Sequence, residues 1–562
     1  MKSGTLSKEA GWLAATATTL VLSGGAALAQ GTHDAELRID PAAYATVHVT
    51  VDGSPMALRR YEAVYVGKPI AMAEEQPARS MGPGGSPSRS KTQTLADPYA
   101  YQKLAIFVPP GATDTSAIIL NVSNGGWFAS ELRDGIEEGK AYVSDSDTDK
   151  AGAALAAGYV YVDVGTRGRG IIAVNGSYPG HAPAAVVDTK AAIRWLRLND
   201  SALPGSAERI VVTGTSGGGG LTAVVAASGD SSDYQPYLAE IGAAGMAADK
   251  TSTLSDAVFA AIAYCPITDL GHADMAYEWL YGPLRGAGNT AGGLLTDEQS
   301  SASAKLAMAY PEYLAGLGLT LADGQALTVE TMTEAISAEV IASVERHVAT
   351  GGSVPAMGEP FDVTIPRMFG GEVAINLPNT WVSVEAGRVT GFDLQAFLAF
   401  VAQVTALKPV PAFDRSNNTG NEGIDGENTL FGTVGQAWSN FTPYGWNAND
   451  IAGDGSGMDD TGADWQTWLA GDGAHLAEQI RMIDPMSYLR TDAKAAPYWY
   501  VRHGMIDRDT SFAVEVALSR AIAGDSDVRE VNFALPWMTP HSGDYDVQEA
   551  YHWLARMLAG AK

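Results

Sequence analysis

The chain has 562 residues, of which 46% are hydrophobic and 18% are charged. This length and balance are typical of a folded globular protein with more than one domain equivalent, and they argue against a disordered chain. The net charge of −28 argues against nucleic acid and anionic membranes as partners, because both would repel the protein.

The first segment of the chain has the pattern of a secretory signal. Lys2 and Lys8 give a basic start, residues 12–22 form a short apolar stretch, and an Ala-Leu-Ala sequence at 27–29 offers a cleavage site. The alternative is an ordinary N-terminal helix. We predict a signal peptide over residues 1–29 and an exported protein, periplasmic or extracellular, with no membrane attachment after cleavage.

Short apolar segments alternate with helical patterns from about residue 100 to residue 270. Strands are predicted at residues 104–108, 117–122, 159–164, 210–212 and 258–265, and helices at about 184–199 and directly after residue 216. Buried strands that alternate with helices indicate an α/β fold with a mainly parallel sheet covered on both faces.

The same alternation returns near the C-terminus, with predicted strands at 498–501 and 531–535 and predicted helices at 511–523 and 547–558. The segment between has helical stretches, around 336–344 and 394–404, separated by long loops rich in Gly, Asn and Asp. We therefore predict three regions after the signal. They are the first part of the core at 30–270, an inserted lid domain at 271–485, and the second part of the core at 486–562.

The most informative motif is a serine framed by glycines. Gly214-Thr215-Ser216-Gly217-Gly218 lies between a predicted strand and a predicted helix. The small residues let the strand and the helix approach each other around a serine held in a strained turn, which is the nucleophile elbow of α/β-hydrolases. The motif alone is common, so the prediction depends on an acid, a base and an oxyanion site elsewhere in the chain.

Two later loops supply an acid and a base. Asp507 and Asp509 follow the first of the C-terminal strands, and His541 lies in the loop before the final helix. The order Ser, Asp, His is that of α/β-hydrolases, so we predict a triad of Ser216, Asp507 and His541. One of the two aspartates is expected to support the start of the following helix instead. His503 is the alternative base, and His541 is otherwise a loop histidine held by backbone groups.

The oxyanion donors are predicted to be backbone N–H groups. Gly217 follows the serine, and Gly125 and Gly126 follow the strand at 117–122, as that role requires. The alternative is a plain glycine turn. The glycine- and arginine-containing residues 163–170 lack a phosphate-loop pattern and are expected to form a structural crossover loop.

The predicted chemistry needs no metal and no organic cofactor. Cys265 is the only cysteine, so no intrachain disulfide can form. It follows an apolar run, which predicts a buried small hydrophobic residue and not a catalytic thiol.

Beyond these motifs, several stretches resemble the bacterial tannases (tannin acylhydrolases). The similarity covers the two parts of the core well and the insertion poorly. The resembling stretches are residues 124–127, 182–192, 214–218, 263–270, 273–279, 502–504, 507–512, 535–537 and 540–546. The resemblance implies an α/β-hydrolase fold and a serine esterase that hydrolyses galloyl esters (tannins and alkyl gallates) to gallate and an alcohol through an acyl-enzyme.

The resemblance also implies that a lysine and two carboxylates recognise the hydroxyls of the galloyl ring. Lys408, Glu427 and Asp509 match these positions. The stretch between Lys408 and Glu427 is longer than in the family, so Glu422 is a weaker candidate for the second carboxylate. Gly217 stands where alanine is usual in the family. Without the resemblance, Lys408 is equally explained by its place at the end of a predicted helix.

Two other functions remain open with the same fold. One is a feruloyl or general carboxylesterase that uses the same triad. The other is a non-catalytic hydrolase-fold binding protein, against which the complete set of serine, acid and histidine argues. In each case we expect a monomer that binds a small molecule, without nucleic acid or membrane partners.

Overall fold

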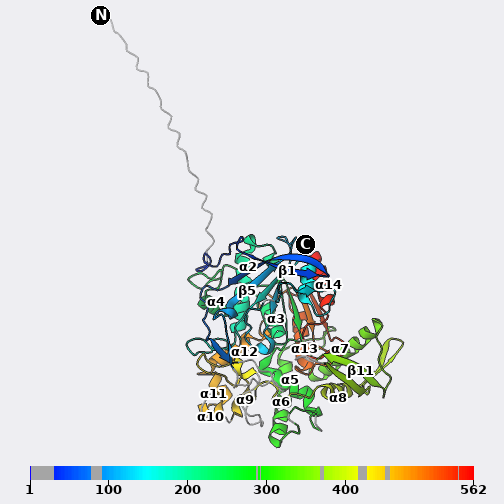
Figure 1. Cartoon of the computed structure of the whole chain (residues 1–562). Coiled ribbons are helices and arrows are strands. Elements are labelled where there is room, and N and C mark those ends of the chain that lie inside the picture. Colours follow the sequence, from blue (N-terminus) through cyan, green and yellow to red (C-terminus); the bar gives the residue numbers. More distant parts are fainter. Residues whose placement is uncertain are drawn as a thin grey trace.

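The structure is a computed structural model (Figure 1). It describes residue 1 and residues 31–77, 92–133, 135–286, 289–291, 293–366, 372–415, 427–449, 456–541 and 543–561. The predicted signal peptide, apart from its first residue, and the alternative carboxylate Glu422 lie outside the described residues.

A ten-stranded sheet forms the centre of the molecule (Figure 1). Its order is β16 (Glu530–Ala534), β15 (Tyr498–Arg502), β10 (Ala260–Tyr264), β9 (Ile210–Thr215), β6 (Ile118–Val122), β8 (Val160–Val164), β5 (Lys103–Val108), β2 (Ser54–Val64), β1 (Ala45–Val51) and β7 (Ala141–Tyr142). Neighbours from β16 to β8 pair parallel, and neighbours from β8 to β1 pair antiparallel. The predicted mainly parallel sheet is confirmed.

The strands predicted from apolar runs are all present, whereas β1 and β2 were not predicted. β1 and β2 form an antiparallel hairpin near one edge of the sheet, and much of β2 is only partly buried. Arg59 and Arg60 lie in the middle of β2. A strand with one partly solvated face lacks the continuous apolar run that identifies the central strands.

Helices cover both faces of the sheet. Those on one face are α2 (Ala184–Leu198), α3 (Gly217–Ala227) and α13 (Phe512–Ala523), and those on the other are α1 (Lys150–Ala156) and α14 (Val547–Gly560). Side chains alternate along each strand, so Leu120 and Val212 join the first core while Ile119 and Val211 join the second. Two buried faces explain why the central strands are apolar at nearly every position.

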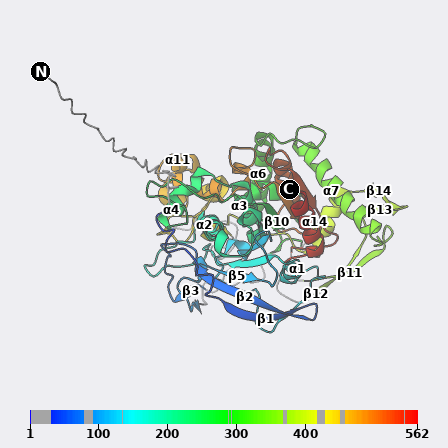
Figure 2. The same cartoon turned by 90° about the horizontal axis from the view of Figure 1, so that it is seen from above.

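The described elements between β10 and β15 all lie outside the ten-stranded sheet. They include α5 (Leu270–Tyr281), α6 (Asp297–Gly316), α7 (Val329–Ala349), β11 (Pro360–Pro366), β12 (Glu372–Pro378), β13 (Val382–Glu385), β14 (Arg388–Phe392), α8 (Leu394–Val404), α9 (Pro443–Asn447), α10 (Met458–Thr461), α11 (Trp465–Leu469) and α12 (Ala474–Met482). In Figures 1 and 2, α7 and the strands β11–β14 extend to one side of the molecule, and α9–α12 lie on the other. The β11–β12 and β13–β14 hairpins were not predicted.

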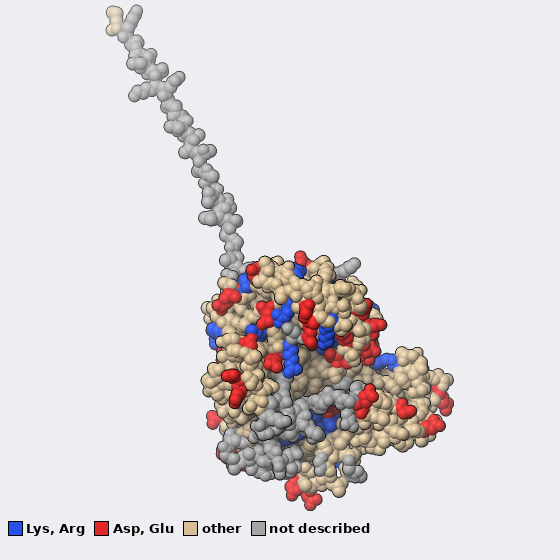
Figure 3. Space-filling view, in the orientation of Figure 1, with Lys and Arg blue, Asp and Glu red and all other residues tan. Residues whose placement is uncertain are grey.

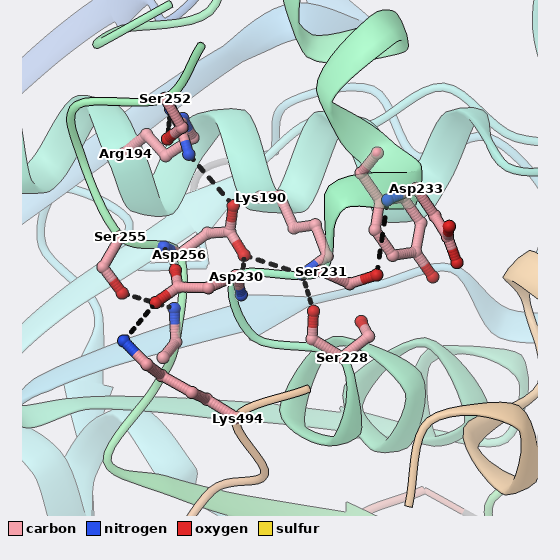
Figure 4. A network of polar contacts seen from close by, with 12 residues as sticks. Lys190, Arg194, Ser228, Asp230, Ser231, Asp233, Ser252, Ser255, Asp256 and Lys494 are labelled. Carbon is pink, nitrogen blue, oxygen red and sulfur yellow. Dashed lines mark hydrogen bonds and ion pairs between the residues drawn. The ribbon is translucent and has the colours of Figure 1, made fainter. Parts of the chain in front are cut away.

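A buried ionic network holds α2 against the sheet (Figure 4). The Asp256 carboxylate lies 2.8 Å from Lys190 Nζ and 3.1 Å from Arg194 Nη1, and all three side chains are buried. Two buried cations share one carboxylate, so removing Asp256 should cost about 3–5 kcal/mol of stability. Asp256 precedes β10, so the network lies at the end of the strands opposite to Ser216 and serves the fold.

Acidic side chains are spread over the face shown in Figure 3, including the lobe that contains α7 and β11–β14. This distribution agrees with the net charge of −28. Within the described residues, no helix has both the length and the apolar character that a membrane crossing requires.

Candidate active site

Ser216 lies in a tight turn between β9 and α3. Its backbone has φ 62° and ψ −123°, a strained conformation for a residue with a side chain. Two hydrogen bonds hold the turn: the Ser216 N–H donates to Tyr264 O (2.9 Å), and the Ile267 N–H donates to Ser216 O (3.1 Å). The neighbouring strand β10 and the chain that follows it therefore fix the serine in its strained turn.

The glycines around Ser216 are required by close backbone contacts. A Cβ atom at Gly214 would lie 2.4 Å from Gly218 O, and one at Gly219 would lie 2.5 Å from Tyr264 O. Neither distance is possible without moving backbone, so strand and helix can approach only through residues without side chains. These contacts form the local geometry that the glycine-framed serine predicted.

Ser216, His541 and Asp507 form a continuous hydrogen-bonded chain. His541 Nε2 lies 2.9 Å from Ser216 Oγ, and His541 Nδ1 lies 2.7 Å from Asp507 Oδ2. Asp507 is fully buried, and its other oxygen accepts the Asp509 N–H at 2.8 Å. The three residues come from the ends of β9 and β15 and from the loop before α14. In this arrangement the histidine can take the proton of the serine while the carboxylate orients the ring.

The charged groups around His541 determine in which direction its pKa is shifted. Burial alone would lower the pKa of His541, but the neighbouring Asp507 and Asp509 carboxylates help to raise it well above its ordinary value. The Asp509 carboxylate lies 3.8 Å from His541 Nε2. An imidazolium formed during the reaction would therefore be stabilised on both sides of the ring.

His503, the alternative base, does not contact the serine. It is fully buried behind the triad, with Nδ1 3.5 Å from Asp507 Oδ2 and 3.7 Å from Glu515 Oε1. Burial lowers the pKa of His503 and raises that of Glu515 well above its ordinary value. The structure therefore brings His541, and not His503, to Ser216.

The expectation that one aspartate supports the start of the next helix is wrong in its detail. Helix α13 is capped by Ser511, whose hydroxyl accepts the Ala513 N–H at 3.3 Å. Asp507 faces His541, and the Asp509 carboxylate pairs with the Arg508 guanidinium. Both carboxylates are therefore directed to the site, because a serine at the correct position already satisfies the helix.

The predicted oxyanion groups lie next to one another. Residues Gly125–Trp127 form a single turn after β6, in which Gly126 has φ 60°. A Cβ atom at Gly217 would lie 2.8 Å from Gly126 N and 2.2 Å from Trp127 N. The glycine at 217, where alanine is usual in the resembling family, therefore has a physical reason here, because this turn packs directly on the start of α3.

Lys408, Glu427 and Asp509 form a group of opposite charges beside the triad. The charges of Glu427 and Asp509 both act on Lys408, whose pKa is lowered by burial in spite of them. The Lys408 ammonium lies 3.8 Å from the centre of the Phe413 ring. The charges of Arg508 and His541, and to a smaller extent that of Lys408, hold the pKa of Asp509 well below its ordinary value despite burial. The group offers both donors and acceptors to a ligand with ring hydroxyls.

The chain is similar to a known protein family and to several solved structures. A family model described as BD-FAE matches residues 104–312, a range that contains Ser216 and the Gly125–Trp127 turn. No curated protein sequence matches the chain. A solved tannin acyl hydrolase in complex with 3,4-dihydroxybenzoate is 28% identical, with a TM-score of 0.71 over 93% of this chain and 99% of that chain. The chain is a structural relative of the bacterial tannases.

Other tannase structures agree with this relationship. The Fusobacterium nucleatum tannase is 27% identical (TM-score 0.68), and the tannin acyl hydrolase from Lactobacillus plantarum is 28% identical (TM-score 0.69). Each covers 93% of this chain and 99% of the solved chain. The resemblance inferred from sequence and the α/β-hydrolase fold are confirmed, and the tannase-like chain is a carboxylic ester hydrolase.

Arg169 is a residue of this tannase-like site that the sequence did not identify. Its Nε donates to Gly126 O, its guanidinium lies 3.9 Å from the centre of the Phe128 ring, and its Nη2 lies 3.8 Å from Glu427 Oε1. The residue belongs to the 163–170 loop that was expected to be only a structural crossover. It joins the predicted oxyanion turn to the predicted ring-binding carboxylate.

Two buried aspartates fix the segments that carry Lys408 and Glu427. Asp274 of α5 accepts the N–H groups of Phe413 (2.8 Å) and Asp414 (3.0 Å). Asp414 in turn accepts from the Asn428 amide (2.6 Å), next to Glu427. Burial raises the pKa of Asp274 to about 6 and that of Asp414 to about 7. The local sequence does not indicate that Asp274 holds this segment, because its hydrogen-bond partners lie about 140 residues away in the chain.

Cys265 is fully buried, as predicted, and lies beside the triad. One possible ligand atom each of Cys265, Asp507 and His541 falls within 4.8 Å of the others. Burial raises the pKa of the Cys265 thiol. A neutral thiol fits the prediction of a packing residue.

Proposed function

We propose that the protein is an exported serine esterase that hydrolyses galloyl esters to gallate and an alcohol. The hydrogen-bonded chain from Ser216 through His541 to Asp507 carries this proposal. The similarity to tannin acyl hydrolases, including one solved in complex with ethyl gallate at 28% identity, supports the choice of acyl group.

In the first half of the reaction, Ser216 Oγ attacks the ester carbonyl while His541 Nε2 takes the hydroxyl proton. The negative charge that develops on the carbonyl oxygen is stabilised by the N–H of Gly217 and by one from Gly125 or Gly126, each worth about 3–4 kcal/mol in comparable sites. His541 then protonates the alkoxide oxygen as the carbon–oxygen bond breaks. The alcohol leaves, and the acyl group remains on Ser216.

In the second half, water takes the place of the alcohol. His541 removes a proton from the water as its oxygen attacks the acyl carbon, and the proton passes to Ser216 Oγ when that bond breaks. Gallate and the free enzyme result. The buried Asp507 carboxylate keeps His541 oriented and stabilises its charged form in both halves.

Recognition of the acyl group depends on Lys408, Glu427 and Asp509. Phenolic hydroxyls donate to carboxylates and accept from an ammonium group, so this group of charges is matched to a hydroxylated benzoate. An acyl group that lacks these hydroxyls would leave the charges without partners. A site of this kind discriminates strongly against such analogues.

The test compares kcat/KM for methyl gallate, methyl ferulate and methyl benzoate in the wild type and in Lys408→Met. We expect the wild type to prefer methyl gallate. In Lys408→Met, kcat/KM for methyl gallate should fall about 10- to 100-fold, the value of one charge-assisted hydrogen bond. The kcat/KM for methyl benzoate, which has no ring hydroxyl, should fall much less in this variant.

The matched control is Lys305→Met on the exposed side of α6, which removes a lysine without touching the site. Equal losses for gallate and benzoate in Lys408→Met would contradict its role in ring recognition. A wild-type preference for methyl ferulate would replace the tannase assignment by a feruloyl esterase.

Export is a separate part of the proposal and rests on the residues 1–29 of the sequence. Expression of the full chain in a bacterial host and N-terminal sequencing of the product tests it. We expect a mature chain that begins at Gln30 outside the cytoplasm, and an uncleaved cytoplasmic product would contradict export.

A further inference from the structure

Two buried titratable side chains lie directly behind the catalytic acid, and neither takes part in the steps of the reaction. They are His503, which follows β15, and Glu515, in the first turn of α13. Both are fully buried. Within the described residues, both ring nitrogens of His503 and both carboxyl oxygens of Glu515 lack a hydrogen-bond partner. Such groups are rare and costly, so their place beside the triad calls for a functional explanation.

The His503 ring lies beside two carboxyl groups. Its Nδ1 is 3.5 Å from Asp507 Oδ2 and 3.7 Å from Glu515 Oε1. The same Asp507 Oδ2 lies 2.7 Å from His541 Nδ1. The Phe512 ring packs edge-on against His503, with the ring centres 5.2 Å apart. One oxygen of the catalytic acid therefore faces two imidazole rings, of which only His541 reaches the serine.

Burial determines the charge of His503 and of Glu515. It lowers the pKa of His503 against the opposing charge of Asp507. It raises the pKa of Glu515 well above its ordinary value, and the charge of Asp507 adds to this shift. His503 and Glu515 are therefore both uncharged while Asp507 is ionised. Because a charged carboxylate is the stronger acceptor, the proton of the His503 ring is expected on Nδ1, facing Asp507.

We propose that His503 is a positioning residue for the catalytic acid, because its Nδ1–H faces Asp507 Oδ2 and holds that carboxylate ionised and oriented toward His541. Glu515, as an uncharged carboxylic acid, leaves the His503 proton to Asp507, whereas an ionised Glu515 would compete for it. The proposal rests on the proposed function only in requiring a serine esterase, whatever its acyl group.

The role of His503 has a consequence for the pH dependence of activity. A donor that faces Asp507 stabilises its negative charge and so weakens the affinity of the Asp507–His541 pair for a proton. His541 must be neutral to accept the proton of Ser216. His503 should therefore keep the acid limb of kcat/KM at a lower pH than Asp507 alone would give.

The other titratable groups around the triad keep a fixed charge in the pH range of this limb. Burial raises the pKa of Cys265, Tyr281 and Tyr545, so all three stay neutral. The pKa of Arg508 is raised by Asp509 in spite of burial, and that of Asp509 is held well below its ordinary value, so both stay charged. A shift of the limb can therefore be assigned to the imidazoles and to the groups that face them.

The test compares the pH profile of kcat/KM for phenyl acetate in the wild type, His503→Leu and His503→Asn. Leucine and asparagine have similar sizes, but the asparagine amide can place an N–H near the position of Nδ1 and does not titrate. In His503→Leu the acid limb should move to higher pH by up to about one unit, and kcat should fall about tenfold with little change in KM. His503→Asn should keep the limb near its wild-type position.

The matched control is His552→Asn, on the exposed side of α14, which should leave the profile unchanged. Equal acid limbs in the two His503 variants, or a move to lower pH in His503→Leu, would overturn the proposal, because a merely structural role does not separate these variants. Glu515→Gln replaces the carboxylic acid by a neutral group of the same shape and should also keep the limb. A move to lower pH in Glu515→Gln would show that Glu515 is charged and would overturn its assigned role.

A second measurement reads the proton position directly in the wild type. Nitrogen NMR of protein labelled with 15N-histidine distinguishes the two neutral forms of each ring, and the resonances of His503 are assigned by their loss in His503→Asn. We expect a neutral His503 with its proton on Nδ1 from about pH 5 to pH 8. A proton on Nε2 would overturn the proposal. Failure of the proposed function would be seen separately, as no hydrolysis of any ester by the wild type, and the NMR result does not depend on turnover.

Discussion

Two regions of the molecule meet at Ser216, and they are held in different ways. At the catalytic edge, defined by Ser216, Asp507 and His541, the parallel strands β9 and β15 fix the residues through backbone contacts. In the insertion between β10 and β15, Lys408 follows α8 outside any helix or strand, and Glu427 begins a short 3-10 helix (Glu427–Leu430). Those segments are held by the buried carboxylates Asp274 and Asp414.

This difference in support suggests a division of roles: the catalytic edge carries out the reaction, and the insertion recognises the substrate. The catalytic edge offers chemistry that would act on any ester, because its geometry depends on the sheet. The insertion offers a charged surface whose geometry depends on a few buried polar contacts. Changes in the first region should therefore affect all substrates, and changes in the second should affect some substrates and the stability of the insertion.

The largest expected effect is the loss of activity when the catalytic edge is disrupted. Ser216→Ala removes the nucleophile, and kcat should fall by at least about 10,000-fold for every ester, whatever its acyl group. Hydrolysis of methyl gallate and of phenyl acetate measures it, and thermal unfolding shows whether the variant is folded. A folded variant that loses activity on only one of the two esters would contradict the separation of the two regions.

A smaller effect concerns the stability of the insertion. The pKa of Asp414 is raised from 3.8 to about 7 in the folded protein, so the folded state holds this proton more tightly than the unfolded state. Its contribution to stability is complete below about pH 4 and is lost as the pH rises through about 7. Asp414→Asn, which does not titrate, should make the decline of the unfolding free energy shallower by at most about 1.4 kcal/mol per pH unit.

Urea denaturation between pH 4.5 and 8 measures this decline. The exposed Asp114, changed to Asn, is the control and should leave the slope as in the wild type. A steeper decline in Asp414→Asn than in the wild type would show that its carboxyl group is not the one that titrates in the insertion.

The smallest expected effect concerns the pH dependence of activity. It tests Asp509, which lies between His541 of the catalytic edge and Lys408 of the insertion. His541 must be neutral to accept the serine proton, and the neighbouring carboxylates raise its pKa, so activity should be lost at a higher pH than for an ordinary histidine as the pH falls. Asp509→Asn removes one of the charges that raise this pKa. The acid limb of kcat/KM should therefore move to lower pH by up to about one unit.

Phenyl acetate is the substrate for this pH profile, because it has no ring hydroxyls for Asp509 to recognise. Asp509→Glu keeps the charge and is expected to keep the acid limb near its wild-type position. A shift of the Asp509→Asn limb toward higher pH would contradict the proposed influence of Asp509 on His541.

The sequence predicted the catalytic edge better than the insertion, for a physical reason. Central strands such as β6 and β9 are apolar throughout because both of their faces are buried, and the triad residues follow in the order that the fold requires. These signals are local. The β1–β2 and β11–β14 hairpins have mixed polar and apolar patterns, so they carried no comparable signal.

The residues that organise recognition were missed because their roles depend on distant partners. Asp274 and Asp414 resemble ordinary acidic residues until the chain folds, and they act through contacts between segments far apart in sequence. Lys408 and Glu427 were identified only through resemblance to a family. Nothing in their local sequence marks them as neighbours.

Arg169 has a consequence for how the enzyme would choose between substrates. The same guanidinium contacts Gly126, in the turn that is proposed to stabilise the transition state, and faces Glu427, which is proposed to hold the ring. A substrate ring that binds Glu427 would therefore also affect the position of the Gly125–Trp127 turn, through Arg169. We expect good and poor acyl groups to differ in kcat as well as in KM, so that selection takes place during the reaction and not only at binding.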